Sequence, residues 1–402
     1  MSHPAYAARV TRIKASPSLA AAARARELAA AGRDVLDLTL GEPDFDTPPH
    51  VKAAAIAAIE AGQTKYTPVN GTPELRQAII ASLKERTGIR YGDAEIAVSG
   101  GAKQIIYVAL AATLNHDDEV VIPAPYWLSY PDMVLANDGK PVIVPCPDTQ
   151  GFLLTPEALD AAIGPRTRWL MLNAPGNPTG AAYTAGQLRA LADVLLAHPQ
   201  VGVLSDEIYD EIYFGSSPLR SIVSVAPELA SRTLVVNGVS KAYAMTGWRL
   251  GYAGGPEGLI AAMNKLQGQM STCPSSVSQA AARAALEGDQ SPVREMTEIY
   301  RKRRDLTVDL LNAVPGLTVA PPAGAFYLFP RCADILGRRT ADGTVLRSDE
   351  DVVLYLLDAA GVATVHGAAY GLSPHFRISF ATSEDILRQA VARIAAALAA
   401  LR

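Results

Sequence analysis

The sequence predicts an α/β fold, because short apolar runs alternate with segments of helical periodicity over residues 49–289. Runs that are almost wholly apolar are typical of strands buried on both faces of a mostly parallel sheet. They occupy 96–99, 119–122, 169–173, 201–205 and 234–237, and each ends in Gly, Pro or polar residues. The last third of the chain changes to shorter alternating segments, which indicates a smaller α+β part.

The helices are predicted from apolar residues that recur on one face. The first buried strand is followed by two glycines and a helix over 102–114, in which three apolar residues recur at intervals of four. A long helix begins at Ser291, and a closing helix begins after Ser383, which we expect to be its N-cap. Strand candidates between them are 324–329, 361–365 and 376–380.

The change of pattern predicts two domains. Residues 49–289 would form a large domain around the sheet, and residues 1–48 and 290–402 would form a small domain with an N-terminal arm. Neither a repeat nor a low-complexity linker suggests another division of the chain.

The composition argues against several classes of partner. With 49% hydrophobic and 19% charged residues, the chain is typical of a globular protein. A formal net charge of −4 without a Lys/Arg cluster argues against a nucleic-acid partner. No apolar run reaches the roughly 18 residues of a membrane span, and N-terminal arginines interrupt any secretory apolar region. Three cysteines at unrelated spacings indicate neither disulfides nor a metal site, so we expect a cytoplasmic protein without a metal.

The strand over 234–237 is followed by Ser240 and Lys241, and then by Gly247 and Arg249. Ligands bind beyond the carboxyl ends of strands in open α/β sheets, which places this lysine at a candidate site. Taken alone, such a lysine is more often a solvated loop residue. Arg249, eight residues later, changes this interpretation, because a lysine that binds a phosphorylated aldehyde needs a fixed anion-binding partner.

Asp206 follows the strand over 201–205, and Tyr209 comes three residues later. A carboxylate at this point can simply cap a helix, and Tyr209 can be a tyrosine at the edge of the core. Against the pyridine nitrogen of pyridoxal 5′-phosphate (PLP), the same carboxylate would keep the ring protonated, so that the ring accepts electrons from a breaking C–H bond. Tyr209 could then donate to the 3′-oxygen of PLP. The residues alone leave both interpretations open.

Motifs in a fixed order extend over nearly the whole chain. They are Gly41-Glu42-Pro43-Asp44-Phe45-Asp46-Thr47-Pro48, Lys65-Tyr66-Thr67-Pro68, Gly101-Ala102-Lys103-Gln104, Pro125-Tyr126-Trp127, Asn173-Ala174-Pro175-Gly176-Asn177-Pro178-Thr179-Gly180, Asp206-Glu207-Ile208-Tyr209, 237–249, Gly324-Ala325-Phe326-Tyr327 and Phe376-Arg377-Ile378-Ser379. Together they resemble the fold-type I PLP-dependent aminotransferases, specifically the bacterial aspartate aminotransferase-like subgroup of class I and II. The interval of 35 residues between Asp206 and Lys241 is also similar to that of the family.

The resemblance implies PLP as the cofactor and Lys241 as the catalytic residue, which binds PLP covalently and moves a proton. It assigns further cofactor contacts to Asp206 at the pyridine nitrogen, Asn177 and Tyr209 at the 3′-oxygen, Trp127 on the ring, and Ala102, Lys103 and Arg249 at the phosphate. It also implies a homodimer with shared active sites, in which Tyr66 reaches the phosphate bound by the partner subunit.

The resemblance implies substrate contacts as well. Gly41 would lie against the substrate, together with Trp127 and Asn177, and Arg377 would bind the α-carboxylate with its planar fork. A second carboxylate would need its own cation, for which Lys14 and Lys103 are candidates. Lys14 can equally be a solvated residue of the arm, and Lys103 can merely support the phosphate.

Two positions depart from the family pattern. Gly238 stands where many relatives have a phosphate-binding serine, and Ser240 is the neighbouring hydroxyl that we retain as a candidate cofactor contact. Ala102 stands where close relatives often have glycine, which is harmless if its φ is negative.

The expected reaction is therefore PLP-dependent transamination between an L-amino acid, most simply aspartate, and a 2-oxo acid, most simply 2-oxoglutarate. An aromatic, prephenate or broad-specificity aminotransferase remains open, because a flexible lysine is a weaker carboxylate ligand than arginine. Another PLP enzyme on the same fold, such as a β-lyase, also remains open, since fold alone does not determine function.

Overall fold

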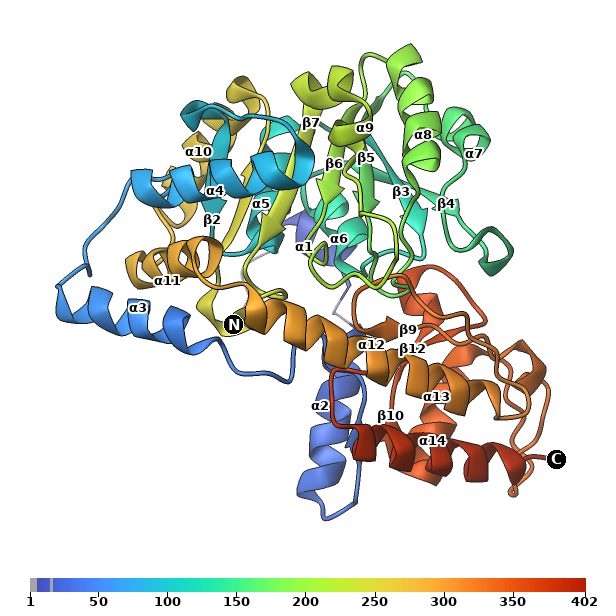
Figure 1. Ribbon diagram of the computed structural model, residues 1–402. Coiled ribbons are helices and arrows are strands. Elements are labelled where there is room, and N and C mark those ends of the chain that lie inside the picture. The colour runs from blue at the N-terminus through green and yellow to red at the C-terminus, as the bar shows by residue number, and fades with distance from the viewer. Residues whose placement is uncertain (1–5, 15–16) are drawn as a thin grey trace, which may run out of the picture.

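A sheet of seven strands lies at the centre of the larger part of the molecule, among the residues that the structure describes, 6–14 and 17–402 (Figure 1). In this computed structural model the strand order is β2-β8-β7-β6-β5-β3-β4. The bounds are β2 Ile96–Ser99, β3 Glu119–Ala124, β4 Lys140–Pro145, β5 Thr167–Asn173, β6 Gly202–Asp206, β7 Thr233–Gly238 and β8 Gly251–Gly254. β8 is antiparallel to both of its neighbours and the other pairs are parallel. The prediction of a mostly parallel sheet is confirmed.

The five predicted buried strands of this sheet are all present, and its two other strands were not predicted from the sequence. β4 lies at the edge of the sheet and contains Pro141 and Pro145, which are residues that weaken a strand pattern. β8 consists of Gly-Tyr-Ala-Gly and has no apolar run. The first of its two glycines, Gly251, is nevertheless required, because a Cβ atom there would lie 2.2 Å from the backbone nitrogen of Ala102.

Helices cover both faces of this sheet. Both faces need this cover, because successive residues of each strand point to opposite faces and nearly all of them are apolar. One face packs against α4 Pro73–Thr87, α8 Ala185–Ala197 and α11 Ser276–Glu287. The other packs against α5 Ala102–Thr113, α6 Ser129–Ala136 and α10 Glu257–Met270. The remaining helices of this part are α3 Pro49–Glu60, α7 Pro156–Ala162 and α9 Ile222–Val225. The helix predicted over 102–114 is confirmed as α5.

The C-terminal residues form a second core, drawn in orange and red in Figure 1. Its helices are α12 Ser291–Asn312, α13 Asp349–Tyr355 and α14 Glu384–Ala399, which pack with an antiparallel sheet in the order β11-β12-β9. The strands are β9 Tyr327–Leu328, β11 Val365–His366 and β12 Phe376–Ser379, and β1 Leu36–Asp37 pairs in parallel with β10 Val362–Ala363. At the N-terminal end, α1 Ala8–Arg12 precedes α2 Pro17–Ala30, which contacts β10.

Three features of this part were predicted with different success. The closing helix is confirmed, and the Oγ of Ser383 accepts a hydrogen bond from the backbone nitrogen of Ile386 at 3.3 Å. The strand predicted over 324–329 is too long, because Ala325 has a φ of 56° that interrupts extended backbone. The strand predicted over 361–365 is divided into β10 and β11.

The division into a large domain of 49–289 and a small domain of 1–48 and 290–402 stays a proposal. Leu38 belongs to the C-terminal core, which supports assigning the first segment to the small domain. Residues 1–5 and 15–16 of that segment lie outside the described residues. Within the described chain, every helix is too short or too polar to cross a membrane.

Candidate active site

A cavity of about 530 Å³ lies where the carboxyl ends of the central strands meet the C-terminal part. Most of the predicted site residues line it: Gly41, Ala102, Lys103, Trp127, Asn177, Asp206, Tyr209, Ser240, Lys241, Arg249 and Arg377. They come from the segments that follow β2, β3, β5, β6 and β7, together with β12 and the segment after β1. The large sheet and the C-terminal part together therefore bring into one cavity residues that are up to 336 positions apart, from Gly41 to Arg377.

Lys241 follows β7 by three residues and extends into this cavity. Its Nζ donates a hydrogen bond to the backbone oxygen of Gly41. Burial lowers the pKa of Lys241 to about 8, with Arg377 and Arg249 acting in the same direction and Glu42 opposing them. A lysine in this range holds a substantial neutral fraction near neutral pH, as a nucleophile or general base requires.

Asp206 is the last residue of β6 and is only 4% exposed. Its Oδ2 accepts a hydrogen bond from the hydroxyl of Tyr130 at 2.6 Å, and its Oδ1 accepts one from the backbone nitrogen of Ile208 at 3.3 Å. Burial raises the pKa of Asp206 to about 6, although these bonds and Lys241 favour the ionised form. A buried carboxylate of this kind is stabilised by a cationic partner.

An anion-binding cradle lies at the start of α5. Gly101 precedes the helix with a φ of 108° and has no side chain to cap it, so the first N–H groups, of Ala102 and Lys103, remain for a ligand. Arg249 adds a guanidinium, which donates to the backbone oxygens of Thr246 at 2.8 Å and Gly100 at 3.2 Å. A Cβ atom at Gly101 would lie 2.6 Å from Nη2 of Arg249, so glycine permits this close approach.

Arg377 lies on β12 and is buried at 2% exposure. Its Nη1 donates to Oδ1 of Asn177 at 3.1 Å, and its Nη2 donates to the backbone oxygen of Thr39. The guanidinium also stacks 4.6 Å from the ring centre of Tyr327. Its Nε has no hydrogen-bond partner among the described residues, and a ligand carboxylate could satisfy it.

Aromatic side chains border the cavity between these charged groups. The hydroxyl of Tyr209 lies 3.0 Å from that of Tyr327. Tyr209 is in a short turn after β6 rather than in a helix, so the interpretation of Asp206 as a helix cap is not supported. The ring of Trp127 stands edge-on to Tyr130, and Nζ of Lys103 lies 4.7 Å from the centre of the Trp127 ring. Burial lowers the pKa of Lys103, and Arg249 lowers it further.

Two predicted residues lie outside this cavity. Tyr66 is 87% exposed. Lys14 borders a neighbouring groove of about 440 Å³, which it shares with Lys103 and Arg249, and its backbone nitrogen donates to Oδ1 of Asp132 at 3.1 Å. The single chain therefore does not bring Tyr66 to the cavity, and it places Lys14 beside the cavity.

The structure explains both departures from the family pattern. A Cβ atom at Gly238 would lie 3.0 Å from the backbone oxygen of Leu250 and 3.1 Å from the Cα of Gly251. A serine there would need its neighbours to move. Ala102 is in helical conformation at the start of α5, so its side chain costs nothing.

Sequence reasoning missed several residues of the site. Glu42 lines the cavity and accepts a hydrogen bond from the hydroxyl of Thr246 at 2.9 Å. Asn173 donates to the backbone oxygen of Asp206 at 3.0 Å, and Tyr130 donates to its carboxylate. Glu42 and Asn173 stand inside quoted motifs and could have been found there. Tyr130 has no local signal, because its partner is 76 positions away.

Comparisons with known proteins agree on one family. The family model of aminotransferase class I and II matches residues 33–394. The aspartate/prephenate aminotransferase of Cereibacter sphaeroides is 51% identical over 392 residues, which are 98% of each chain. The crystal structure of the aspartate aminotransferase from Rhizobium meliloti has a TM-score of 0.98 at 51% identity and covers 100% of both chains. That of Thermus thermophilus aspartate aminotransferase with maleate has a TM-score of 0.91 at 40% identity, covering 98% of this chain and 100% of that one.

The chain therefore belongs to the class I and II aminotransferases. It has the fold of the aspartate aminotransferases to which it is similar, and the predicted fold type I is confirmed.

Proposed function

We propose that the protein is a PLP-dependent aminotransferase that uses aspartate as amino donor and 2-oxoglutarate as acceptor. The observation that carries the proposal is a single cavity that holds a lysine with a lowered pKa between a buried carboxylate and two arginines. Lys241 supplies the amine, Asp206 the carboxylate, and Arg249 and Arg377 two separate sites for anions.

The residues of this cavity fit PLP at each of its ends. The uncapped start of α5 and Arg249 suit the phosphate, since helix N-termini and guanidinium groups both favour anions. Asp206 suits the protonated pyridine nitrogen, because burial makes its unpaired charge costly. Lys241 would hold the aldehyde carbon, and Asn177 and Tyr209 the 3′-oxygen. Ser240 lines the same cavity and is a further candidate contact.

The chain's own residues divide the work of amino transfer between them. When bound, PLP accepts the electron pair of the breaking Cα–H bond and stores the amino group. Arg377 fixes the α-carboxylate, and its unpartnered Nε is available for a second bond. Lys241 would take the proton from the substrate Cα only after the substrate amine has replaced it, because only the free Nζ has a lone pair, and its lowered pKa permits this near neutral pH. Asp206 would hold negative charge at the pyridine nitrogen, and Trp127, which lines the same cavity, would lie on the ring.

The choice of substrate is supported by the relatives. The Rhizobium meliloti and Thermus thermophilus proteins are named aspartate aminotransferases, and the Thermus structure contains the dicarboxylate maleate. Lys103 lies at the cavity and Lys14 in the groove beside it, so both are candidates for the second carboxylate. The Cereibacter sphaeroides protein is named an aspartate/prephenate aminotransferase, which favours prephenate as a second acceptor.

The proposal includes a homodimer with shared active sites. Tyr66 is 87% exposed in the single chain although it stands in the family motif Lys65-Tyr66-Thr67-Pro68. A tyrosine that contributes to the site of a second copy would be exposed in this way. Isoleucines at 56 and 59 on the neighbouring α3, each 56% exposed, add apolar surface to the same region.

The test is to locate the cofactor and then to measure the reaction. Borohydride reduction of the yellow protein should fix PLP on Lys241, which peptide mass mapping would identify. The protein should convert aspartate and 2-oxoglutarate to oxaloacetate and glutamate, and Lys241→Ala should keep its fold but lose this activity. Wild-type turnover by Lys241→Ala would refute the assignment. Products formed from the donor without any acceptor would indicate a lyase instead.

A further inference from the structure

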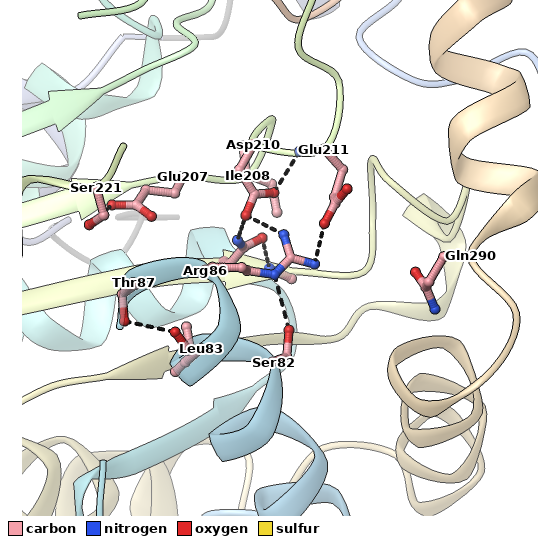
Figure 2. Close-up of polar contacts among 12 residues, drawn as sticks. Ser82, Leu83, Arg86, Thr87, Glu207, Ile208, Asp210, Glu211, Ser221 and Gln290 are labelled. Carbon is pink, nitrogen blue, oxygen red and sulfur yellow. Dashed lines mark hydrogen bonds and ion pairs between the residues drawn. The ribbon is translucent and has the colours of Figure 1, made fainter. Parts of the chain in front are cut away.

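The carboxylate of Asp210 joins two segments that carry proposed active-site residues. Its Oδ2 accepts a hydrogen bond from Nη1 of Arg86, and its Oδ1 accepts one from the backbone nitrogen of Glu211 at 2.9 Å (Figure 2). The same Oδ2 also accepts a hydrogen bond from Nδ2 of Asn237 at 2.7 Å. The Asp210 side chain is 11% exposed. These donors rather than bulk water therefore stabilise its charge.

Arg86 holds this carboxylate from the side of α4. Figure 2 shows its guanidinium between Asp210 and Glu211, and its Nη2 lies 2.7 Å from Oε1 of Glu211. Its Nε donates to Oγ of Ser82, one turn earlier in α4, at 3.0 Å. Because the planar fork contacts three partners at once, a lysine could not replace it fully.

Asn237 holds the same carboxylate from the side of β7. It is 2% exposed, and its Oδ1 accepts from the backbone nitrogen of Gly238 at 2.7 Å while its Nδ2 donates to Asp210. β7 ends at Gly238, and Lys241 follows three residues later. The backbone that leads to Lys241 is thus tied to Asp210.

The turn after β6 is tied to Asp210 directly. The backbone nitrogen of Asp210 donates to the oxygen of Glu207 at 3.0 Å, and the nitrogen of Ile212 donates to the oxygen of Tyr209 at 2.9 Å. A turn closed at two points leaves little freedom between Glu207 and Ile212, the stretch that contains Tyr209. Displacement of the Asp210 side chain would therefore move Tyr209 relative to Lys241.

We infer that Asp210 is a positioning residue, which sets the spacing between the segment from Asp206 to Tyr209 and the segment after β7 that contains Lys241. Arg86 and Asn237 are the two sides of this link. The inference rests on the proposed function of those three residues. Misplacement of a reacting group by about 1 Å can cost about a hundredfold in rate, so a link of this kind affects catalysis without touching the substrate.

The experiment compares Asp210→Asn and Arg86→Lys in the full-length, cofactor-loaded protein. Asp210→Asn keeps the shape but turns an acceptor toward Asn237 or Arg86 into a donor. The matched control is the exposed cluster in which Arg189 also bridges an Asp and a Glu, Asp193 and Glu228. Asp193→Asn and Arg189→Lys make the same changes in residues that do not line the cavity.

The expected result for Asp210→Asn is a fall in kcat of about tenfold or more with the donor KM within about twofold, because Arg377 is not part of the link. The pH at which the bound cofactor changes its absorption should shift, and the affinity of the cofactor-free protein for PLP should fall. Arg86→Lys should change the same quantities less. The control variants should leave all of them unchanged.

A double variant sharpens the test. If Asp210 acts through Asn237, the loss of PLP affinity in Asp210→Asn with Asn237→Ala should be smaller than the product of the single losses. Wild-type kcat, absorption and PLP affinity in Asp210→Asn, with only a lower melting temperature, would overturn the inference. If Asp210→Asn does not fold, Arg86→Lys decides by the same readouts. Failure of the proposed function would show already in the wild type, which would then not bind PLP at Lys241.

Discussion

The hydroxyl of Tyr130 donates a 2.6 Å hydrogen bond to Oδ2 of Asp206, the carboxylate that we propose for the pyridine nitrogen of PLP. Both residues are buried, and they come from α6 and β6. Burial raises the pKa of Asp206, and the Tyr130 bond is the largest effect that opposes this rise. Tyr130 therefore helps to keep a negative charge in the cavity.

Replacing Tyr130 by phenylalanine should raise the pKa of Asp206 further. Asp206 loses its charge as the pH falls through its pKa, which is about 6 in the cofactor-free protein, so PLP affinity should weaken below that pH. In Tyr130→Phe the midpoint of this weakening should move upward by up to about one pH unit, the equivalent of one hydrogen bond. PLP titrations over about pH 5 to 8, a range that includes the pKa of Asp206 before and after the change, would measure this midpoint. The control is Tyr183→Phe, which removes another buried tyrosine hydroxyl. That hydroxyl accepts a hydrogen bond from the backbone nitrogen of Leu154, and its loss should not move the midpoint.

Glu207 should make the stability of the protein depend on pH. Burial raises its pKa from 4.5 to about 7, although the hydroxyls of Ser205 and Ser221 donate to it. Because the folded pKa is the higher one, the folded state holds the proton between these values, and stability is lost as the pH rises toward 7. Glu207→Gln, which can still accept from both serines, should be more stable than wild type at about pH 8 by about 1–3 kcal/mol.

Thermal unfolding of the cofactor-free protein at both ends of this window checks the prediction. The difference should shrink near pH 5, where Glu207 is already protonated in the folded state. Glu287→Gln, from the exposed pair with Arg283, serves as control. An equal difference at both pH values would show that the charge is not responsible.

Complementation should reveal site sharing between subunits. Tyr66→Phe and Arg249→Ala each damage the proposed phosphate site, but from different subunits if Tyr66 serves its partner. Co-expression should then produce heterodimers with one undamaged site, and activity above that of either variant alone. If purified mixed dimers are no more active than the single variants, Tyr66 does not act across the interface.

Lys103 should distinguish acidic from neutral donors. If it binds the second carboxylate, Lys103→Ala should cost about 1.5–3 kcal/mol in kcat/KM for aspartate and glutamate, and little for tyrosine, phenylalanine and alanine. Lys84→Ala, on the exposed face of α4, provides the baseline. Equal losses for both classes of donor would assign Lys103 to the cofactor phosphate.

A side chain at Gly238 should destabilise the fold. The 3.0 Å approach of a Cβ atom to the backbone of Leu250 predicts a loss of about 1–3 kcal/mol for Gly238→Ala in chemical denaturation. Gly258→Ala in α10, where nothing lies within 4 Å of the added atom, should instead be neutral or stabilising. Equal stability of the two variants would show that β8 can move away from β7.

Local patterns in the sequence were sufficient for most elements of the fold. Apolar runs such as 234–237, which became β7, and the helix after Gly101 depend on neighbours within a few residues, so they can be recognised without the structure. The positions of Lys241, Asp206 and Asn177 after strand ends also follow from this order, because parallel strands end at one edge of a sheet. The chain alone thus indicated both the fold class and most of the cavity.

Only the tertiary structure determined which side chains meet. Tyr130 reaches Asp206 across 76 positions, and Arg377 reaches the backbone of Thr39 across 338. β8 escaped prediction because its glycines are required by residues of other elements, Gly251 by Ala102 and Gly254 by Leu83 and Tyr91, rather than by any local pattern. Such contacts depend on close packing between distant segments, where a shift of an ångström exchanges one hydrogen-bond partner for another. The sequence determined by itself which residues could do the chemistry, and packing decided which of them share a partner.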